Sequence, residues 1–512
     1  MVCNNSLQCF SRWRNVIISL LAKLVAVLIV LFPLVNPTSA NRCLALSTFT
    51  IIMLVFNPIP LYATAFLVPV LVVSGSVLRD ASGTPLPAKL AARRIVGSMF
   101  GAIIPILLAS FTIAACFRKY NVLGHFLINK KRPKLLNQMP WLVGSLVFGT
   151  LSLCFFLPNI SSVLIISSLM DNIIIEAEIK DIQRAIVLSI AIGGSIGGFL
   201  TPISSPQSMF VFTLGSDFLQ LTWWQWLAVS IPCVTLISIF AWPLIAIVCR
   251  VTKAELVVKP ESDIENSPEN HAPSVEGEEQ ALNDTPEASY ATNSMSEVVP
   301  LRRLIVVLII AILTILLWSF TPLMASWIGD MAIVSFIPMV IIFAFGILDL
   351  SDLARLPWDL IMVVMGLLAL VEAAKSSGLL TVVVASIVNQ LRVLGIWSNI
   401  AISCLVIFIF STFTTHTISG LIAAPLIIIY AQMSGSLSSS NLQAFYLTTG
   451  FTTSIGMTFP FSSMVNLAMF GTNDAQGQRI LSRLDFVKVG LPISILCYLL
   501  IISLGTVISL HI

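Results

Sequence analysis

Four short polar clusters interrupt the long apolar runs of this sequence. They comprise Asn159, Ser161 and Ser162; Ser204, Ser205 and Gln207; Thr415, His416 and Thr417; and Ser462, Ser463 and Asn466. Hydroxyl and amide groups donate hydrogen bonds to an oxyanion, whereas backbone carbonyl groups freed by a helix break can coordinate a cation. The clusters therefore predict a site for a small oxyanion with an accompanying cation.

The elements that must position these clusters are helices that begin inside an apolar layer. Break signals accompany the clusters at Leu157-Pro158, Thr201-Pro202 and Phe459-Pro460. A helix N-terminus offers free N–H groups and a partial positive charge, so it binds an anion without Arg or Lys. A single Ser or Thr in a membrane helix more often packs or bonds to its own carbonyl groups. Four clusters that coincide with breaks favour binding.

Three charged or titratable residues within apolar segments leave alternatives open. His416 is the only one of the four histidines deep in such a segment. It could bind or orient the solute, carry protons, or serve a structural role. Glu372 and Lys375 lie three residues apart at the end of a segment, which indicates a solvated or interfacial helical pair.

Composition places the whole chain in a membrane. Of the 512 residues, 57% are hydrophobic and 10% are charged, unlike a soluble domain of this size. The apolar runs are continuous rather than alternating, which favours helices over a barrel. The net charge of +3 is too small to indicate a nucleic-acid partner, and the nine cysteines lack metal-site or disulfide spacing. We expect an all-α integral membrane protein with about 11 transmembrane helices in a lipid bilayer.

Charge divides the chain into segments. We predict an N-terminal segment with a first span at 1–42, a first repeat at 43–250, a disordered acidic linker at 251–300 and a second repeat at 301–512. Basic residues flank the linker, so the positive-inside rule places it in the cytosol. The run Val16–Val35 is either a retained span or a cleaved signal peptide.

An internal repeat supports the two halves. GGSIGGFLTPISSPQS (193–208) shares Ser-Ile-Gly and then Pro-x-Ser-Ser with TTSIGMTFPFSSMVN (452–466), 258 to 259 residues later. FFLPNISSVL (155–164) pairs with FTTHTISGLI (413–422) at an offset of 258. Transporters are commonly built from such repeats, with the solute held where broken helices of both halves meet.

One motif offers an enzymatic alternative. Gly193 to Gly197 fits the G-x-S-x-G nucleophile elbow, but that motif requires a preceding strand, and this segment reads as helix. Close helix packing explains Gly193 and Gly197 more simply. Because nucleotide, zinc and dinucleotide motifs are also absent from the sequence, we expect no enzyme activity and no cofactor beyond a coupling ion.

Four segments resemble the divalent anion to sodium symporter (DASS) superfamily, and within it the low-affinity phosphate permeases of fungi and other eukaryotes. These are IPLYATAFLVPVLVVSG (59–75), LPWDLIMVVMGLLALVEAAKSSGLL (356–380), STFTTHTISGLI (411–422) and TPISSPQS (201–208). The last is the most specific, and it favours inorganic phosphate as the substrate. The alternatives are a dicarboxylate or sulfate symporter and a phosphate sensor that does not transport.

The resemblance implies an elevator-type homodimer with two inverted repeats, two re-entrant helical hairpins and Na+ or H+ as coupling ion. The hairpin tips fall on residues 158–160 and 415–417, and the loops of two broken spans fall on 204–208 and 462–466. The cation ligands are then expected among Asn159, Ser161, Thr415, Thr417 and Asn466. The sequence departs from the family at Pro158, Ile160 and Ser208. Because about fifteen residues precede the first span, we expect this chain to differ from many such permeases in having no N-terminal SPX domain. The sequence is compatible with a location in the plasma membrane or in an organellar membrane.

Overall fold

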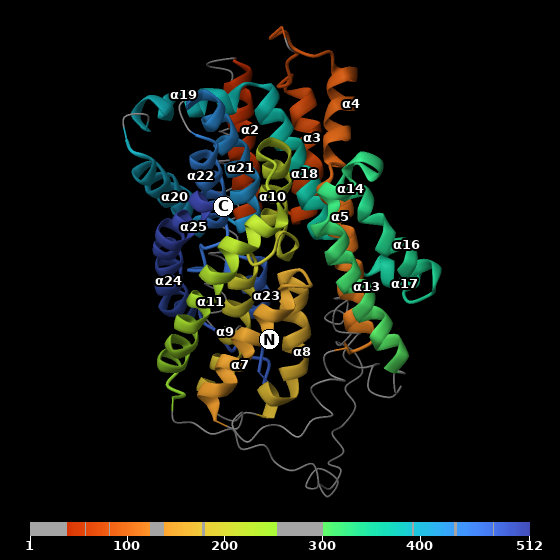
Figure 1. The fold of residues 1–512 in the computed structure, drawn as a ribbon, viewed down its shortest axis with the longest axis vertical. Coiled ribbons are helices and arrows are strands. Elements are labelled where there is room, and N and C mark those ends of the chain that lie inside the picture. Colours follow the sequence, from red (N-terminus) through yellow and green to blue (C-terminus); the bar gives the residue numbers. More distant parts are fainter. Residues whose placement is uncertain are drawn as a thin grey trace, which may run out of the picture.

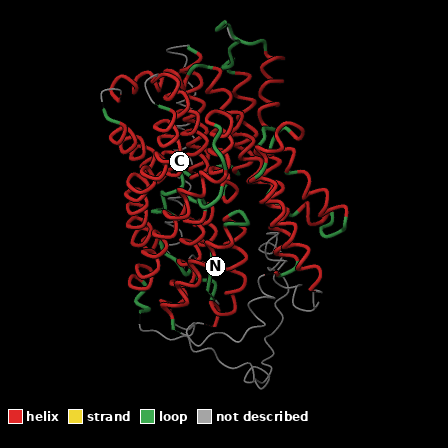
Figure 2. Tube along the Cα trace, in the orientation of Figure 1, coloured by secondary structure: helices red, strands yellow, loops and turns green. Residues whose placement is uncertain are grey.

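The computed structural model describes residues 38–56, 58–80, 82–122, 138–176, 180–252, 301–391, 394–434, 438–474 and 476–512. Within these ranges the regular structure is helical, and two isolated bridges, Arg79 with Pro85 and Asn473 with Arg479, are the only β pairing (Figure 2). The predicted first span Val16–Val35 and nearly all of the predicted linker lie outside the described residues.

The helices of the first half run in chain order as α2 (Ser39–Phe56), α3 (Leu61–Ser74), α4 (Ala88–Met99), α5 (Ile103–Lys119), α7 (Met139–Cys154), α8 (Asn159–Glu176), α9 (Lys180–Gly197), the 3₁₀ turn η3 (Pro202–Ser204), α10 (Pro206–Leu219) and α11 (Trp223–Val248).

Those of the second half are α13 (Leu301–Ser319), α14 (Thr321–Ile328), α15 (Met331–Val334), α16 (Phe336–Ala344), α17 (Leu350–Ala354), α18 (Trp358–Ser376), α19 (Leu379–Leu391), α20 (Ile396–Phe413), α21 (His416–Ser434), α22 (Ser439–Thr452), η6 (Pro460–Ser462), α23 (Met464–Phe470), α24 (Arg483–Leu500), the π-helical turn η7 (Ile501–Gly505) and α25 (Thr506–His511).

Helix length separates continuous spans from interrupted ones. Five helical segments of the described chain are long and apolar enough to cross a membrane: Ala88–Lys119, Trp223–Val248, Arg302–Ser319, Ile396–Phe413 and Arg483–His511. A sixth arises if α18 and the start of α19, which are bent by 67°, form one broken span. Six shorter helices are also apolar. The all-helical prediction is therefore confirmed, whereas the count of about 11 spans stays a prediction, since breaks shorten several of the segments.

Local sequence explains where the helices around the breaks begin and end. Ser205 caps α10 by accepting a hydrogen bond from the Ser208 amide, and Pro206 occupies the first helical position, where its missing N–H costs nothing. Thr222 and Gln225 form a capping box at the start of α11. Gly378, at φ +76°, lets the chain turn sharply from α18 into α19.

Small residues let the helices approach closely around the site. α7 packs on α9, α3 on α18, and α10 on α21 (Figure 1). A methyl group added at Gly193 would lie 2.8 Å from the Val147 carbonyl oxygen, and one at Gly197 would lie 2.5 Å from Cys154 Sγ. The predicted close packing through these glycines is therefore confirmed, and it places α9 directly against α7.

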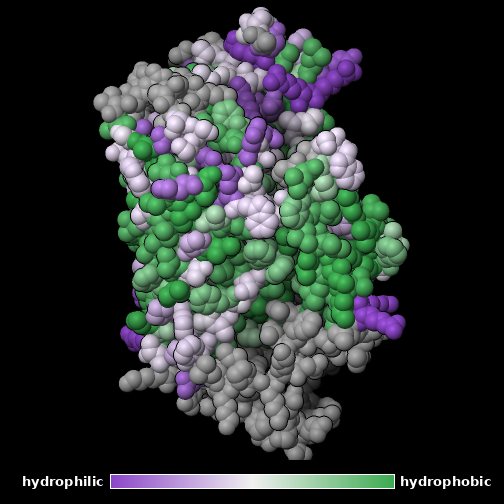
Figure 3. All heavy atoms as spheres, in the orientation of Figure 1, coloured by the Kyte–Doolittle hydropathy of each residue, from purple (hydrophilic) through white to green (hydrophobic). Residues whose placement is uncertain are grey.

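The outer surface suits a bilayer. Apolar side chains cover the middle of the face seen in Figure 3, including the region of α13, while hydrophilic ones gather at the upper end near α4. On α13, Ile309 is 49% exposed and Leu313 is 52% exposed. A contiguous apolar surface of this kind is stable against hydrocarbon rather than water. All seven cysteines in the described residues are free and buried.

Candidate functional site

Two helix breaks with the same local construction lie at the centre of the candidate site. In the first, α9 ends at Gly197, η3 begins at Pro202, and α10 follows its N-cap Ser205. In the second, α22 ends at Thr452, η6 begins at Pro460, and α23 follows its N-cap Ser463. Each break therefore contains a 3₁₀ turn with proline first and then a serine cap, and both are almost entirely buried.

A hairpin tip lies against each break. At the first tip, Asn159 begins α8, and its Nδ2 lies 2.8 Å from where a methyl group on Gly198 would be. At the second, His416 begins α21, and its Nε2 lies 3.0 Å from the Gly456 carbonyl oxygen. Because a carbonyl oxygen only accepts, Nε2 carries the proton of this contact. His416 thus ties a tip to a break, which favours an orienting role among the alternatives left open by the sequence.

The two breaks also contact each other across the halves. Ser195 Oγ on α9 donates to Asn466 Oδ1 on α23 at 2.8 Å, and Gln207 Nε2 on α10 donates to Ser454 Oγ at 3.2 Å. Thr417 Oγ1 lies 3.5 Å from Gln207 Oε1, which connects the second tip to the first break. The folded chain therefore brings all four predicted clusters into one buried region.

Several of the predicted donors are already used by the backbone. Hydroxyl groups donate to carbonyl oxygens from Ser204 to Thr201 at 2.7 Å, from Ser205 to Gly198 at 2.5 Å, and from Ser462 to Phe459 at 2.7 Å. The Ser162 hydroxyl donates to the Pro158 carbonyl oxygen at 3.1 Å. A hydroxyl whose proton is committed in this way cannot donate to an anion, so these four serines stabilise the breaks and the first tip. Thr415 Oγ1 instead accepts from the Ile418 amide, which leaves its own proton available, and Ser161 is buried.

Other polar groups at the site are buried without a partner. Within the described chain, Asn466 Nδ2, Ser419 Oγ and Thr458 Oγ1 make no hydrogen bond, and Ser463 makes no cap bond to its helix. Such groups are rare in folded proteins unless a ligand or water satisfies them. Sequence reasoning missed Ser195, Ser419, Ser454 and Thr458 as site residues, although Ser195 and Ser454 stand in the repeated Ser-Ile-Gly string.

The site contains no charged side chain at its breaks and tips, so its electrostatics come from the backbone. The N-termini of α8, α10 and α21, helices of 18, 14 and 19 residues, point into this region, and each carries a partial positive charge. A cavity of about 160 Å³ adjoins it, with Thr415, Thr417 and Ile418 from the second tip among its lining residues. No cluster of His, Cys, Asp and Glu able to hold a metal occurs in the described residues.

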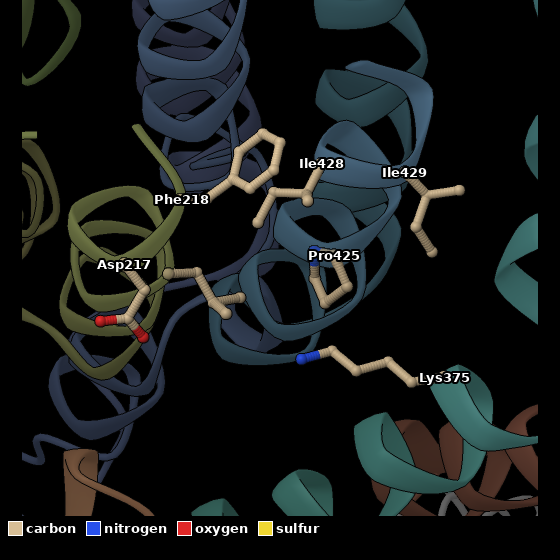
Figure 4. A pocket seen from close by; sticks show the side chains of 7 residues that line it. Asp217, Phe218, Lys375, Pro425, Ile428 and Ile429 are labelled. Atoms are coloured by element: carbon tan, nitrogen blue, oxygen red, sulfur yellow. The ribbon is translucent and has the colours of Figure 1, made fainter. Parts of the chain in front are cut away.

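A larger cavity of about 370 Å³ lies away from the breaks, between α10, α18 and α21 (Figure 4). Lys375 of α18 extends toward Pro425 of α21, and Asp217 of α10 lies on the opposite side of the cavity from Lys375. Glu372 is ion-paired with Arg94 of α4 at 2.6 Å. The interpretation of Glu372 and Lys375 as a helical pair is therefore wrong, because the fold gives each residue a different environment.

The apolar spans, the apolar outer surface and the buried polar breaks define an α-helical integral membrane protein. The sequence profile of the citrate transporter (CitMHS) family matches residues 51–450. The chain belongs to this family.

Three curated relatives share similar levels of identity with the chain. An uncharacterized transporter, C3B8.04c, of Schizosaccharomyces pombe is 26% identical over 98% of the chain and 53% of its own length. From Saccharomyces cerevisiae, the inorganic phosphate transporter PHO87 is 28% identical over 93% of the chain and 47% of its own length, and the low-affinity phosphate transporter PHO90 is 27% identical over 92% and 49%. The chain thus spans about half the length of the curated relatives it matches.

Proposed function

We propose that this protein is a secondary transporter of inorganic phosphate. The observation that carries the proposal is the meeting of four buried helix breaks and tips, where the Asn466 amide and several hydroxyl groups keep unused donors. A dry site of this kind replaces the water shell of a small anion with fixed donors and helix N-termini. Two of the relatives, PHO87 and PHO90, are named as phosphate transporters, which supports the same substrate.

The family name favours a second candidate substrate, the tricarboxylate citrate, and the dicarboxylates remain a related alternative. Citrate carries carboxylates several ångströms apart, and carboxylates are commonly bound by the bidentate fork of Arg. The breaks and tips contain only hydroxyls, amides and one imidazole, and the adjoining cavity of about 160 Å³ is lined mainly by apolar residues. This composition suits a compact tetrahedral oxyanion better than an extended tricarboxylate.

We further propose that a cation accompanies the anion. Na+ and H+ are the two candidates, and the oxygen atoms of Asn159, Ser161, Thr415 and Thr417 around the tips supply hard ligands of the kind Na+ requires. His416 is an unsuitable proton carrier in this arrangement, because its Nε2 proton is held by the Gly456 carbonyl and the ring is buried.

We further propose an orientation of the protein in the membrane, a transport cycle and an oligomeric state. The end of α11 and the start of α13, which flank the acidic linker, lie at the lower end of the molecule in Figure 1, and α4 lies at the upper end. Together with the basic flanks of the linker, this supports a cytosolic location for the lower end. An elevator movement in a homodimer follows from the resemblance to the DASS superfamily.

Uptake by the purified protein in liposomes tests the proposal. Labelled phosphate should accumulate, saturate and exchange by counterflow, with Na+ and pH gradients varied separately to identify the coupling ion. Unlabelled phosphate should compete better than citrate, succinate or sulfate. If citrate or succinate displaces labelled phosphate at lower concentration than phosphate itself, the substrate assignment is wrong, and binding without flux would indicate a sensor.

A further inference from the structure

Two side-chain amides, one from each half, lie at the centre of the site, and each contacts a serine of the opposite half. These are Asn466 with Ser195, and Gln207 with Ser454. All four side chains are buried, with residue exposures from 0% to 3%. The two contacts are related in kind, because in each the serine of a Ser-Ile-Gly string in one half binds an amide that follows the break of the other half.

The two serines bind different ends of their amides, one the oxygen and the other the nitrogen. Ser195 binds the oxygen of Asn466, so Nδ2 is the free end, and it has no partner in the described chain. Ser454 instead accepts a hydrogen bond from the nitrogen of Gln207, so Oε1 is the end turned away from Ser454, where it accepts from the Thr417 hydroxyl at 3.5 Å and keeps a second lone pair. One amide therefore offers hydrogen-bond donors to the site, and the other offers an acceptor.

We propose that Ser195 is a positioning residue that turns the Asn466 amide so that its Nδ2 donates to the bound oxyanion, while Ser454 turns Gln207 so that its Oε1 faces the coupling cation. The site then has an anion pole at Asn466 and a cation pole at Gln207. This assignment deepens the proposed function and rests on it. The sequence-based expectation placed Gln207 with the substrate ligands and Asn466 with both sets. The proposal moves Gln207 to the cation and keeps Asn466 with the substrate alone.

The surroundings of each amide agree with these poles. Ser463, three residues before Asn466, keeps a hydroxyl that makes no cap bond, and Thr458 of the same break has an unpartnered hydroxyl. Near Gln207, by contrast, Ser205 and Ser208 both donate to the Gly198 carbonyl, at 2.5 and 2.8 Å. Each break has one serine hydroxyl committed to its own backbone, Ser204 or Ser462, but the unpartnered donors Thr458 Oγ1 and Asn466 Nδ2 belong to the break that holds Asn466.

Phosphate counterflow by the full chain in liposomes, with KM and maximal rate measured separately, tests the role of Ser195. Ser195→Ala should raise the KM for phosphate about three- to tenfold, since it removes one hydrogen bond that fixes the amide. Ser195→Thr keeps the hydroxyl and should restore the wild-type KM. The matched control is Ser189→Ala in the same helix, because Ser189 is equally buried but bonds only its own helix, at 2.6 Å from the Ala185 oxygen.

Two isosteric variants test the poles themselves. Asn466→Asp replaces the donor with a negative oxygen and should weaken phosphate binding at least about a hundredfold, with the cation dependence unchanged. Gln207→Glu puts a negatively charged oxygen at the cation pole, so it should lower the cation concentration needed for half-maximal transport.

Two results would overturn the inference while leaving phosphate transport intact. In the first, Ser195→Ala behaves like Ser189→Ala. In the second, Asn466→Asp retains phosphate affinity and alters only the cation dependence. A wild-type protein that neither binds nor exchanges phosphate would instead overturn the proposed function itself. If Ser195→Ala does not purify as a monodisperse protein, Asn466→Asp and Gln207→Glu decide the assignment by the same measurements.

Discussion

Replacing Gly420 with alanine should disturb the site without removing any of its polar groups. Gly420 lies in the first turns of α21, where that helix packs on α10. A methyl group there would lie 2.5 Å from Gln207 Cβ and 3.1 Å from Gln207 Cα. Because both atoms are at or beside the backbone, rotation of the glutamine side chain cannot relieve the clash.

The size of the effect follows from these distances. Carbon atoms pack at about 3.5 to 4.0 Å, so α10 and α21 must separate by about 1 Å at this point. Overpacking of this kind costs about 1 to 3 kcal/mol of stability. The same shift would lengthen the contacts of Gln207 with Thr417 and Ser454, which are 3.5 and 3.2 Å long. Displacements of about 1 Å at a site can cost about a hundredfold in activity.

The assay is phosphate counterflow in liposomes together with the thermal unfolding of the purified protein. Gly149→Ala in α7 is the matched control, since a methyl group there meets no atom within 4 Å and should be neutral or stabilising. We expect Gly420→Ala to lose at least about tenfold in transport efficiency, while Gly149→Ala stays near wild type. Equal transport by the two variants would refute the view that the contact between α10 and α21 holds the site together.

Three further predictions concern donors, the linker and the contact between the halves. Ser463→Ala should raise the phosphate KM more than Ser204→Ala, because the Ser204 hydroxyl is already donated to Thr201; equal KM values would contradict this. Deleting residues 260–295 should leave uptake nearly unchanged, since no break or tip falls there; lost flux at normal membrane insertion would show that the linker takes part in the cycle. Arg184→Gln should lower stability by about 1 to 3 kcal/mol, because it unpairs the buried Asp485, whereas changing the half-exposed Asp181 should matter less in thermal unfolding.

The comparison of sequence with structure is clearest at the breaks. Pro202 and Pro460 begin 3₁₀ turns, and Ser205 and Ser463 occupy the N-cap positions of the helices that follow, although only Ser205 makes a cap hydrogen bond. These features depend on backbone rules that act over a few residues, so they are visible in one chain. The number of spans is harder to predict, because hydropathy cannot say whether two half-helices at a break form one span or a hairpin.

Composition and local capping depend on nearby residues alone, so the sequence is enough to predict a helical membrane protein with four polar clusters at helix breaks and tips. Which polar groups of these clusters remain free depends on the tertiary contacts. The partner of Asn466 is Ser195, 271 residues earlier, and the partner of Glu372 is Arg94, 278 residues earlier. A buried hydroxyl or amide can be satisfied by its own helix or by another, and only the packing of distant segments chooses between them.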